Sequence, residues 1–337
     1  MNFTANITRI EHLVNPADIK TLPLSAMEIF LHLYGYLIIG LMLMLINTPV
    51  FVVVMMRKAL RASYLILAIV FLNNALTGMS ATLVGVKRLI ISASEEQYIS
   101  HYDCVFDLPF FLLATFFLNG WSLLMNSAER LCVVAYPLYY YAHNKQVVYS
   151  LIAIQYIITI IALSSTAWAS FTDPIRYISH LCFLRRTYNA YFYAALILLS
   201  STAAIFSIIL MVIVVMMLKR KFGTEFISKH SHNSELTHFL NNQKRYTHTA
   251  LISCFFTFLF YVAPSIMKCV YVLDPTKRSQ IIAMISTYLT LSNSFNMVIL
   301  FLYRQEDVRN AAVHVFRKLF RRKKHNIHPT NVVGFGE

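Results

Sequence analysis

Long apolar stretches separated by short polar segments dominate the chain. Seven of them are long enough to cross the hydrocarbon of a membrane, about 30 Å, which takes roughly 20 helical residues. They lie at residues 33–56, 63–86, 104–128, 147–171, 188–218, 249–273 and 281–303. Because backbone groups in lipid must be satisfied within the segment itself, the pattern predicts an all-α fold, a seven-transmembrane helix bundle.

The polar segments divide the chain into four parts. Residues 1–26 are predicted to form an extracellular amino-terminal tail, 27–304 the seven-helix transmembrane domain, and 325–337 a cytoplasmic tail. In the remaining part, 305–324, apolar residues recur at helical spacing among basic ones. They are Val308, Ala311, Ala312, Val315, Phe316, Leu319 and Phe320. This spacing predicts a short amphipathic helix lying on the inner leaflet after the last span.

Composition excludes an ordinary soluble domain. Of the 337 residues, 58% are hydrophobic and 13% are charged, whereas soluble domains carry about a quarter charged residues. The net charge of +14 is concentrated at one predicted rim of the bundle, where it would face anionic lipid. We therefore expect membrane lipid as a partner and no nucleic acid.

Two features predict the orientation. The side that holds the inner loops and the carboxyl terminus carries 19 of the 29 Lys and Arg residues, and such segments remain in the cytoplasm. The two Asn-x-Ser/Thr sequons, at Asn2 and Asn6, both lie in the amino-terminal tail, where glycosylation requires the lumenal side. We expect a multi-pass protein of the plasma membrane with its amino terminus outside.

Polar residues inside the apolar stretches need partners. Asn47 lies in the first stretch and Asn73 and Asn74 in the second. A buried amide in hydrocarbon must be hydrogen-bonded, so we expect Asn47 and one of the other two to face the bundle interior and bond to each other or to water. These asparagines could serve only as interhelical hydrogen bonds or could take part in a conformational switch, and the sequence is compatible with both roles.

The third and sixth stretches contain the most distinctive motifs. Arg130, beside Glu129, ends the third stretch, and an arginine there is expected at the membrane edge because it is costly in apolar surroundings. Pro137 is expected to stop helical pairing and turn the chain into a loop. Pro264 lies inside the sixth stretch and predicts a bend that can act as a hinge.

These motifs resemble those of rhodopsin-like (class A) G-protein-coupled receptors. Glu129-Arg130 followed by Pro137-Leu138-Tyr139-Tyr140 is similar to the family's motif at the inner end of helix three. Asn47 and Asn296 match asparagines of the family's helices one and seven. The chain departs from the family at Leu131, Tyr261, Val262, Met297 and Leu300. This partial retention is most like the nematode serpentine chemoreceptor families.

The resemblance implies roles for particular residues. Glu129, Arg130, Pro137 and Tyr140 would serve G-protein coupling and activation, and Pro264 would be the hinge. Asn47, Asn74 and Asn296 would form the polar interior. Cys104 and Cys182 both lie in predicted outer positions, and the resemblance implies a disulfide between them.

An outer ligand pocket is also implied, with apolar and aromatic walls and two charge anchors. The residues expected in it are Asp107, Phe111, Tyr261, Lys268, Tyr271 and Tyr288. The helix-three position that carries an acid in amine receptors is Phe111 or Leu112, so an amine ligand is disfavoured. The predicted seventh helix contains no lysine between 281 and 303, which excludes covalent retinal.

The function predicted from these observations is a receptor, and not an enzyme, that transduces an extracellular chemical ligand into heterotrimeric G-protein activation. The resemblance favours a chemosensory receptor, with a neuropeptide-type receptor as the alternative. A small transporter or channel is less favoured because no internal repeat and no line of buried charges is visible. Neither a cofactor nor a metal is expected.

Overall fold

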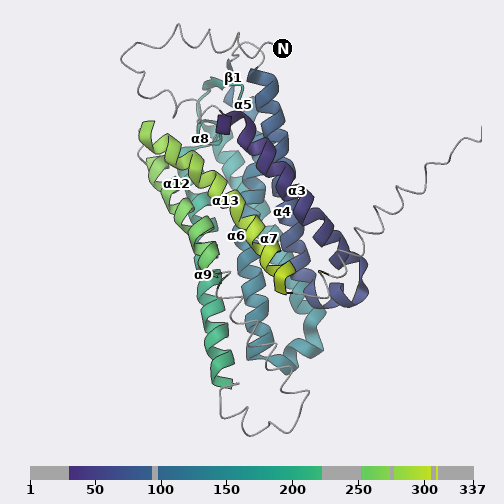
Figure 1. Cartoon of the computed structure of the whole chain (residues 1–337). Coiled ribbons are helices and arrows are strands. Elements are labelled where there is room, and N and C mark those ends of the chain that lie inside the picture. The colour runs from purple at the N-terminus through teal and green to yellow at the C-terminus, as the bar shows by residue number, and fades with distance from the viewer. Residues whose placement is uncertain are drawn as a thin grey trace, which may run out of the picture.

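The computed structural model describes residues 30–92, 98–221, 252, 254–273, 277–304 and 309. Long helices lie side by side and form an elongated bundle (Figure 1). The elements are η2 (Leu31–Gly35), α3 (Tyr36–Met56), α4 (Lys58–Ser92), β1 (Tyr98–Ser100), α5 (His101–Val105), α6 (Leu108–Ala135), α7 (Pro137–Thr172), β2 (Tyr177–Ser179), α8 (Leu184–Thr187), α9 (Ala190–Lys221), η3 (Phe258–Val262), α12 (Ala263–Leu273) and α13 (Lys277–Arg304).

Six helices among the described residues are long and apolar enough to cross a membrane. Their apolar spans are Tyr36–Met56, Tyr64–Ser92, Leu108–Ala135, Leu138–Thr172, Ala190–Arg220 and Met284–Tyr303. The chain is therefore an all-α, multi-pass membrane protein. The predicted stretch at 249–273 is represented by a shorter apolar helix, Cys254–Val270, which makes up η3 and most of α12.

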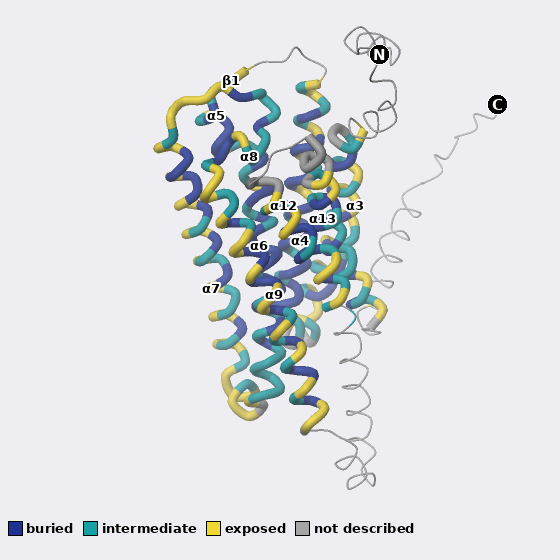
Figure 2. Tube along the Cα trace, turned by 90° about the vertical axis from the view of Figure 1, so that its left-hand side faces the viewer, coloured by how far each residue is buried: buried dark blue, intermediate teal, exposed yellow. Residues whose placement is uncertain are grey.

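Apolar side chains cover the outside of the bundle. In α7 the exposed residues include Ile154, Ile157, Ile160 and Ile161, and Trp168 near the C-terminal end of the helix is 74% exposed. Figure 2 shows this helix at the edge of the bundle, with exposed and half-buried positions along most of its length. Such a surface is stable against lipid tails and not against water, which agrees with a membrane location.

Glycines let α3 and α4 pack closely. A Cβ on Gly78 would lie 2.7 Å from the Gly40 carbonyl oxygen and 2.7 Å from the Met44 amide nitrogen. Only hydrogen fits there, so the two backbones approach each other as small residues allow in membrane helix pairs. Above this contact, Leu43 packs with Ala81 and Leu291 in one buried cluster.

Two boundaries near α6 correct the sequence predictions. Cys104 does not begin the third long helix but lies in the separate short helix α5, and α6 begins after Asp107, whose carboxylate accepts a hydrogen bond from the Leu108 amide. Pro137 does not lead into a loop. It is the first residue of α7, where a missing amide hydrogen leaves no helical bond unmade, and the break falls at Tyr136.

A small structured layer covers one end of the bundle. β1 and β2 pair antiparallel, with Ile99 opposite Ile178, and α5 and α8 lie beside them (Figure 1). His101 is fully buried here. Its Nδ1 accepts a hydrogen bond from the Arg176 amide, and its Nε2 lies 3.2 Å from the Ser170 carbonyl oxygen. This imidazole therefore ties the layer to the C-terminal end of α7.

Several predictions fall outside the described residues. They are the sequons at Asn2 and Asn6, the amino-terminal tail, the amphipathic helix at 305–324 apart from Arg309, and the cytoplasmic tail. The side chain of Tyr271 also belongs to this group, although its backbone lies in α12.

Candidate functional site

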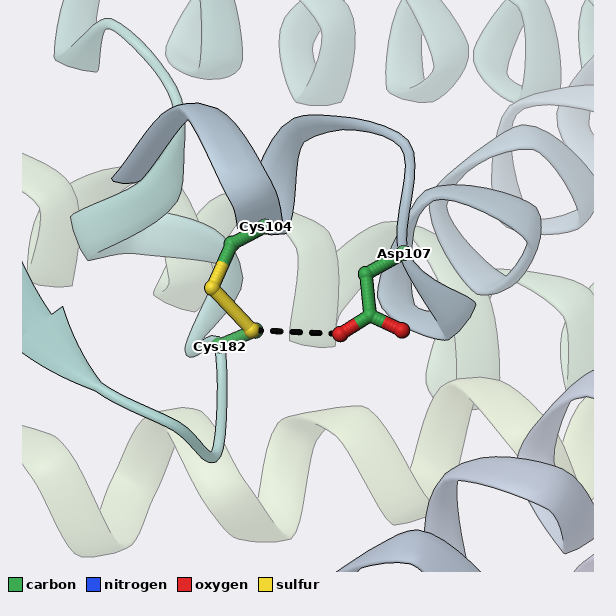
Figure 3. A group of neighbouring side chains, drawn as sticks. All are labelled: Cys104, Asp107 and Cys182. Atoms are coloured by element: carbon green, nitrogen blue, oxygen red, sulfur yellow. Dashed lines mark hydrogen bonds between the residues drawn. A yellow bond between two sulfur atoms is a disulfide. The ribbon is translucent and has the colours of Figure 1, made fainter. Parts of the chain in front are cut away.

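The predicted cysteine pair is close enough to bond. Cys104 of α5 and Cys182, which follows β2, form a disulfide with their Cα atoms 5.5 Å apart, and both are buried. Figure 3 shows Asp107 beside the bridge. Because the bridge joins the start of the α6 region to the segment after β2, it holds that segment across this end of the bundle.

Asp107 has its own cationic partner. Its carboxylate forms an ion pair with Lys87 of α4, and the Lys87 ammonium also lies 3.7 Å from Sγ of Cys182. The Cys182 sulfur lies 3.2 Å from the Asp107 carboxylate. Cys104, Asp107 and Cys182 thus lie close enough together to suggest a metal site. A disulfide sulfur is not a thiolate, however, so this group offers a metal only one carboxylate while the bridge is intact.

A large cavity opens beneath this layer. It is called the outer cavity below, because a second cavity lies deeper in the bundle. It has a volume of about 900 Å³ and is walled by α3, α4, α6, α8, α9, α12 and α13 together with the segment around β2. Apolar and aromatic residues make up much of the wall, among them Tyr36, Val84, Leu112, Tyr193 and Met284. This size and lining fit a small organic molecule.

A smaller, deeper cavity of about 70 Å³ continues toward the bundle centre. Lys268 and Tyr193 line both cavities, and Tyr261 and Ser200 line the deeper one. The Tyr261 hydroxyl lies 2.6 Å from the Ser200 hydroxyl and donates to the Phe116 carbonyl oxygen at 3.1 Å. Tyr261 therefore connects η3 with α6 and α9 at the floor of the cavity.

The predicted pocket residues are only partly brought together. Lys268 and Tyr261 line cavities as expected. Phe111 does not, because it points outward from α6 and is 55% exposed. Tyr288 is buried instead in contact with η2, where its hydroxyl donates to the Leu31 carbonyl oxygen at 2.6 Å. Asp107 lies at the helix start with Lys87 and is not part of the cavity wall.

Pro264 is buried in the first turn of α12, next to a π-helical turn. The turn is η3, Phe258–Val262, and Ser265 donates to the Tyr261 carbonyl oxygen at 2.7 Å. A proline beside a π-helical turn leaves helical hydrogen bonds irregular at this level, as is typical of a bend. The bend lies at the level of the deeper cavity, between Tyr261 and Lys268, which both line it.

The polar interior forms, but with different pairs from those expected. Asn47 donates to the Leu43 carbonyl oxygen of its own helix at 2.9 Å and does not bond directly to Asn73 or Asn74, which was one of the two arrangements expected. Asn73 donates to Ser122 at 2.7 Å, and Asn74 accepts from Ser294 at 2.9 Å. α4 is thereby joined to α6 and α13, because each amide reaches the nearest hydroxyl across its own interface. Asn296 lies half-buried on α13.

The C-terminal end of α6 brings three of the predicted coupling residues together. Glu129 is buried, and its carboxylate accepts a hydrogen bond from the Tyr140 hydroxyl at 2.9 Å. The Arg130 guanidinium lies 3.9 Å from the same carboxylate. Tyr140 belongs to α7, so this acid links two helices. The site lies at the opposite end of α6 from Asp107, roughly 33 Å away at about 1.5 Å per residue.

Cationic residues of the outer cavity were missed by the sequence analysis. Arg88, Arg176, Arg185 and Arg186 all contribute to its wall. One signal was available, since Arg88 ends an otherwise apolar span, where a charge indicates a functional position. The three others come from the connection between α7 and α9, with Arg176 just before β2 and Arg185 and Arg186 on α8.

No protein-family model matches this chain, and no curated protein matches it at a significant level.

Proposed function

We propose that the protein is a G-protein-coupled receptor of the plasma membrane that detects an extracellular chemical ligand, with seven crossings and its amino terminus outside. The observation that carries the proposal is the pairing of two sites at opposite ends of α6. One is the cavity under the disulfide-linked layer, and the other is the Glu129–Arg130–Tyr140 group.

The element that we expect to move between the two sites is the helix formed by η3 and α12. A ligand in the outer cavity contacts Lys268 of α12 and, in its deeper part, Tyr261 of η3. Both lie within a few residues of Pro264, so a ligand that prefers one arrangement of this bend shifts the balance of conformations. The helix beyond the bend would swing at its inner half and open a crevice beside Arg130.

A G-protein that binds only the open form completes the proposal. The G-protein would contact Arg130 and α7 near Tyr140. Because coupling between two sites is reciprocal, the G-protein would increase agonist affinity by the same factor by which the agonist increases G-protein affinity. Glu129 holds the closed form, because its carboxylate is engaged by both Arg130 and Tyr140.

The test replaces Arg130 with alanine. We expect Arg130→Ala to abolish agonist-driven nucleotide exchange on a purified G-protein while surface expression and ligand binding persist, because Arg130 acts only at the inner end. The control is Arg57→Ala, which removes an exposed arginine at the end of α3. Retained exchange in Arg130→Ala, or equal loss in both variants, would contradict the assigned role. Ligand-dependent flux across vesicles without nucleotide exchange would indicate a transporter instead.

A further inference from the structure

The charges on the wall of the outer cavity have one sign. Five of its residues have basic side chains, namely Arg88, Arg176, Arg185, Arg186 and Lys268. No Asp or Glu is found among the described residues that form this wall. Arg176 pairs with Asp173 at 3.1 Å. A wall of this kind creates a positive potential in a concave, partly apolar space, which attracts and retains anions.

Arg88 is the most enclosed of these cations. It is 8% exposed, and its guanidinium carbon lies 4.5 Å from the centre of the Tyr36 ring and 5.6 Å from that of Phe183. Contacts with aromatic rings use the flat faces of a guanidinium. A carboxylate binds a guanidinium in a different way, at the N–H groups on its edge and in a bidentate manner.

Lys268 supplies a second positive charge at the junction of the two cavities. Its ammonium donates to Thr290 at 3.1 Å and lies 5.2 Å from the centre of the Phe116 ring. These contacts orient the ammonium but bring no negative charge. An anionic group at this point would have a charge-assisted partner in partly apolar surroundings, where such bonds are strongest.

The rest of the wall is apolar. Val84, Leu112, Ile197 and Met284 lie among the cations, so a fully hydrated ion such as inorganic phosphate would leave this surface uncovered. A molecule with an acidic head and an apolar or aromatic body would satisfy both parts of the wall.

We propose that the outer cavity binds an amphiphilic organic acid, with its carboxylate held by Arg88 and Lys268 and its body against the apolar wall. This names the ligand class of the receptor described above and rests on that proposed function. The binding test below uses no G-protein, so a failed receptor assay and a failed ligand class give different results.

The experiment uses the full chain in nanodiscs of zwitterionic lipid, with empty nanodiscs subtracted. Binding is measured by calorimetry for octanoate against octanol and octylamine, and for indole acetate against indole ethanol and tryptamine. We expect at least one acid to bind about tenfold or more tightly than its alcohol and its amine, because a bond to a charged group is worth about one tenfold step or more. High salt should weaken the binding of the acid and leave that of the alcohol unchanged.

Two variants locate the site. Arg88→Gln and Lys268→Gln are each expected to reduce the acid's affinity about tenfold while the alcohol's affinity is unchanged, which also shows that the fold persists. Arg57→Gln, at the inner end, is the control and should have no effect. If a variant fails to fold, the order of affinities and the salt dependence in the unmodified protein still test the proposed ligand class. An amine that binds best, or acids that bind no better than their alcohols, would overturn the proposal.

Discussion

At the scale of single residues, the carboxylate of Glu129 shows how one buried charge can hold two helices. It is 2% exposed and is contacted by the Tyr140 hydroxyl and the Arg130 guanidinium. A buried carboxylate that loses a partner retains most of its desolvation penalty, so the partners stabilise this arrangement more than an exposed ion pair would.

Removal of one hydroxyl tests this arrangement. We expect Tyr140→Phe to destabilise the protein by about 1–3 kcal/mol, because the hydrogen bond to a buried carboxylate is lost. The readout is the apparent melting temperature of the purified protein in detergent. Tyr139→Phe is the matched control, since Tyr139 is 60% exposed. Equal melting temperatures for the two variants would count against a stabilising bond at Tyr140.

At the scale of helices, the sequence predicted the long elements well and their ends poorly. Apolar length alone indicates a spanning helix, and six of the seven predicted stretches are spans of adequate length in the described residues. The ends depend on capping and on neighbouring layers. Asp107 starts α6 through its side chain, and Pro137 starts α7 where a loop was expected.

The polar residues inside the helices were less predictable than the helices. Their presence in the interior followed from the cost of an unpaired amide in lipid, but the choice of partner depends on helix rotation and spacing. Asn73 reaches Ser122, and Asn74 reaches Ser294. The partners lie 49 and 220 residues away in sequence, so nothing in the local pattern identifies them.

The contact between α3 and α4 gives a prediction at this scale. Gly78→Ala places a methyl group against backbone atoms of Gly40 and Met44, and backbone cannot rotate out of the way as a side chain can. We expect the free energy of unfolding to fall by about 1–3 kcal/mol, which is typical of overpacking. The measurement is a lower melting temperature. Met79→Ala, at an exposed position on the same helix, is the control. A melting temperature for Gly78→Ala no lower than that of the control would show that α3 can move aside.

At the scale of the whole molecule, the outer layer determines the chemistry of the cavity. The disulfide holds the segment after β2 over the bundle end, and this segment supplies Phe183, Arg185 and Arg186 to the wall. The sequence predicted the cysteine pair and the presence of a cavity. It did not predict the basic wall, because the arginines come from α4, α8 and the segment before β2, and the packing of these elements brings them together without any periodic pattern.

Cysteine replacements test this dependence. We expect Cys104→Ser and Cys182→Ser each to destabilise the protein by about 2–5 kcal/mol, and the double variant to be no less stable than either single one, because one bond is lost in all three. The measurement is thermal unfolding without reductant. Cys132→Ser, which removes a free cysteine, is the control. Additive losses from the two single replacements would argue against a bond between them.

Gly120 sets a limit on ligand length. A Cβ there would lie 2.6 Å from the Ser200 carbonyl oxygen and 2.8 Å from the Tyr261 hydroxyl oxygen, so α6, α9 and η3 meet without spare room at the cavity floor. In the proposed receptor, a molecule that reaches this junction acts on the bend at Pro264 more directly than one that contacts Lys268 alone. Shortened analogues of an agonist would therefore occupy the outer cavity without activating the receptor. Antagonists are expected in the same chemical series, shortened at the end that points inward.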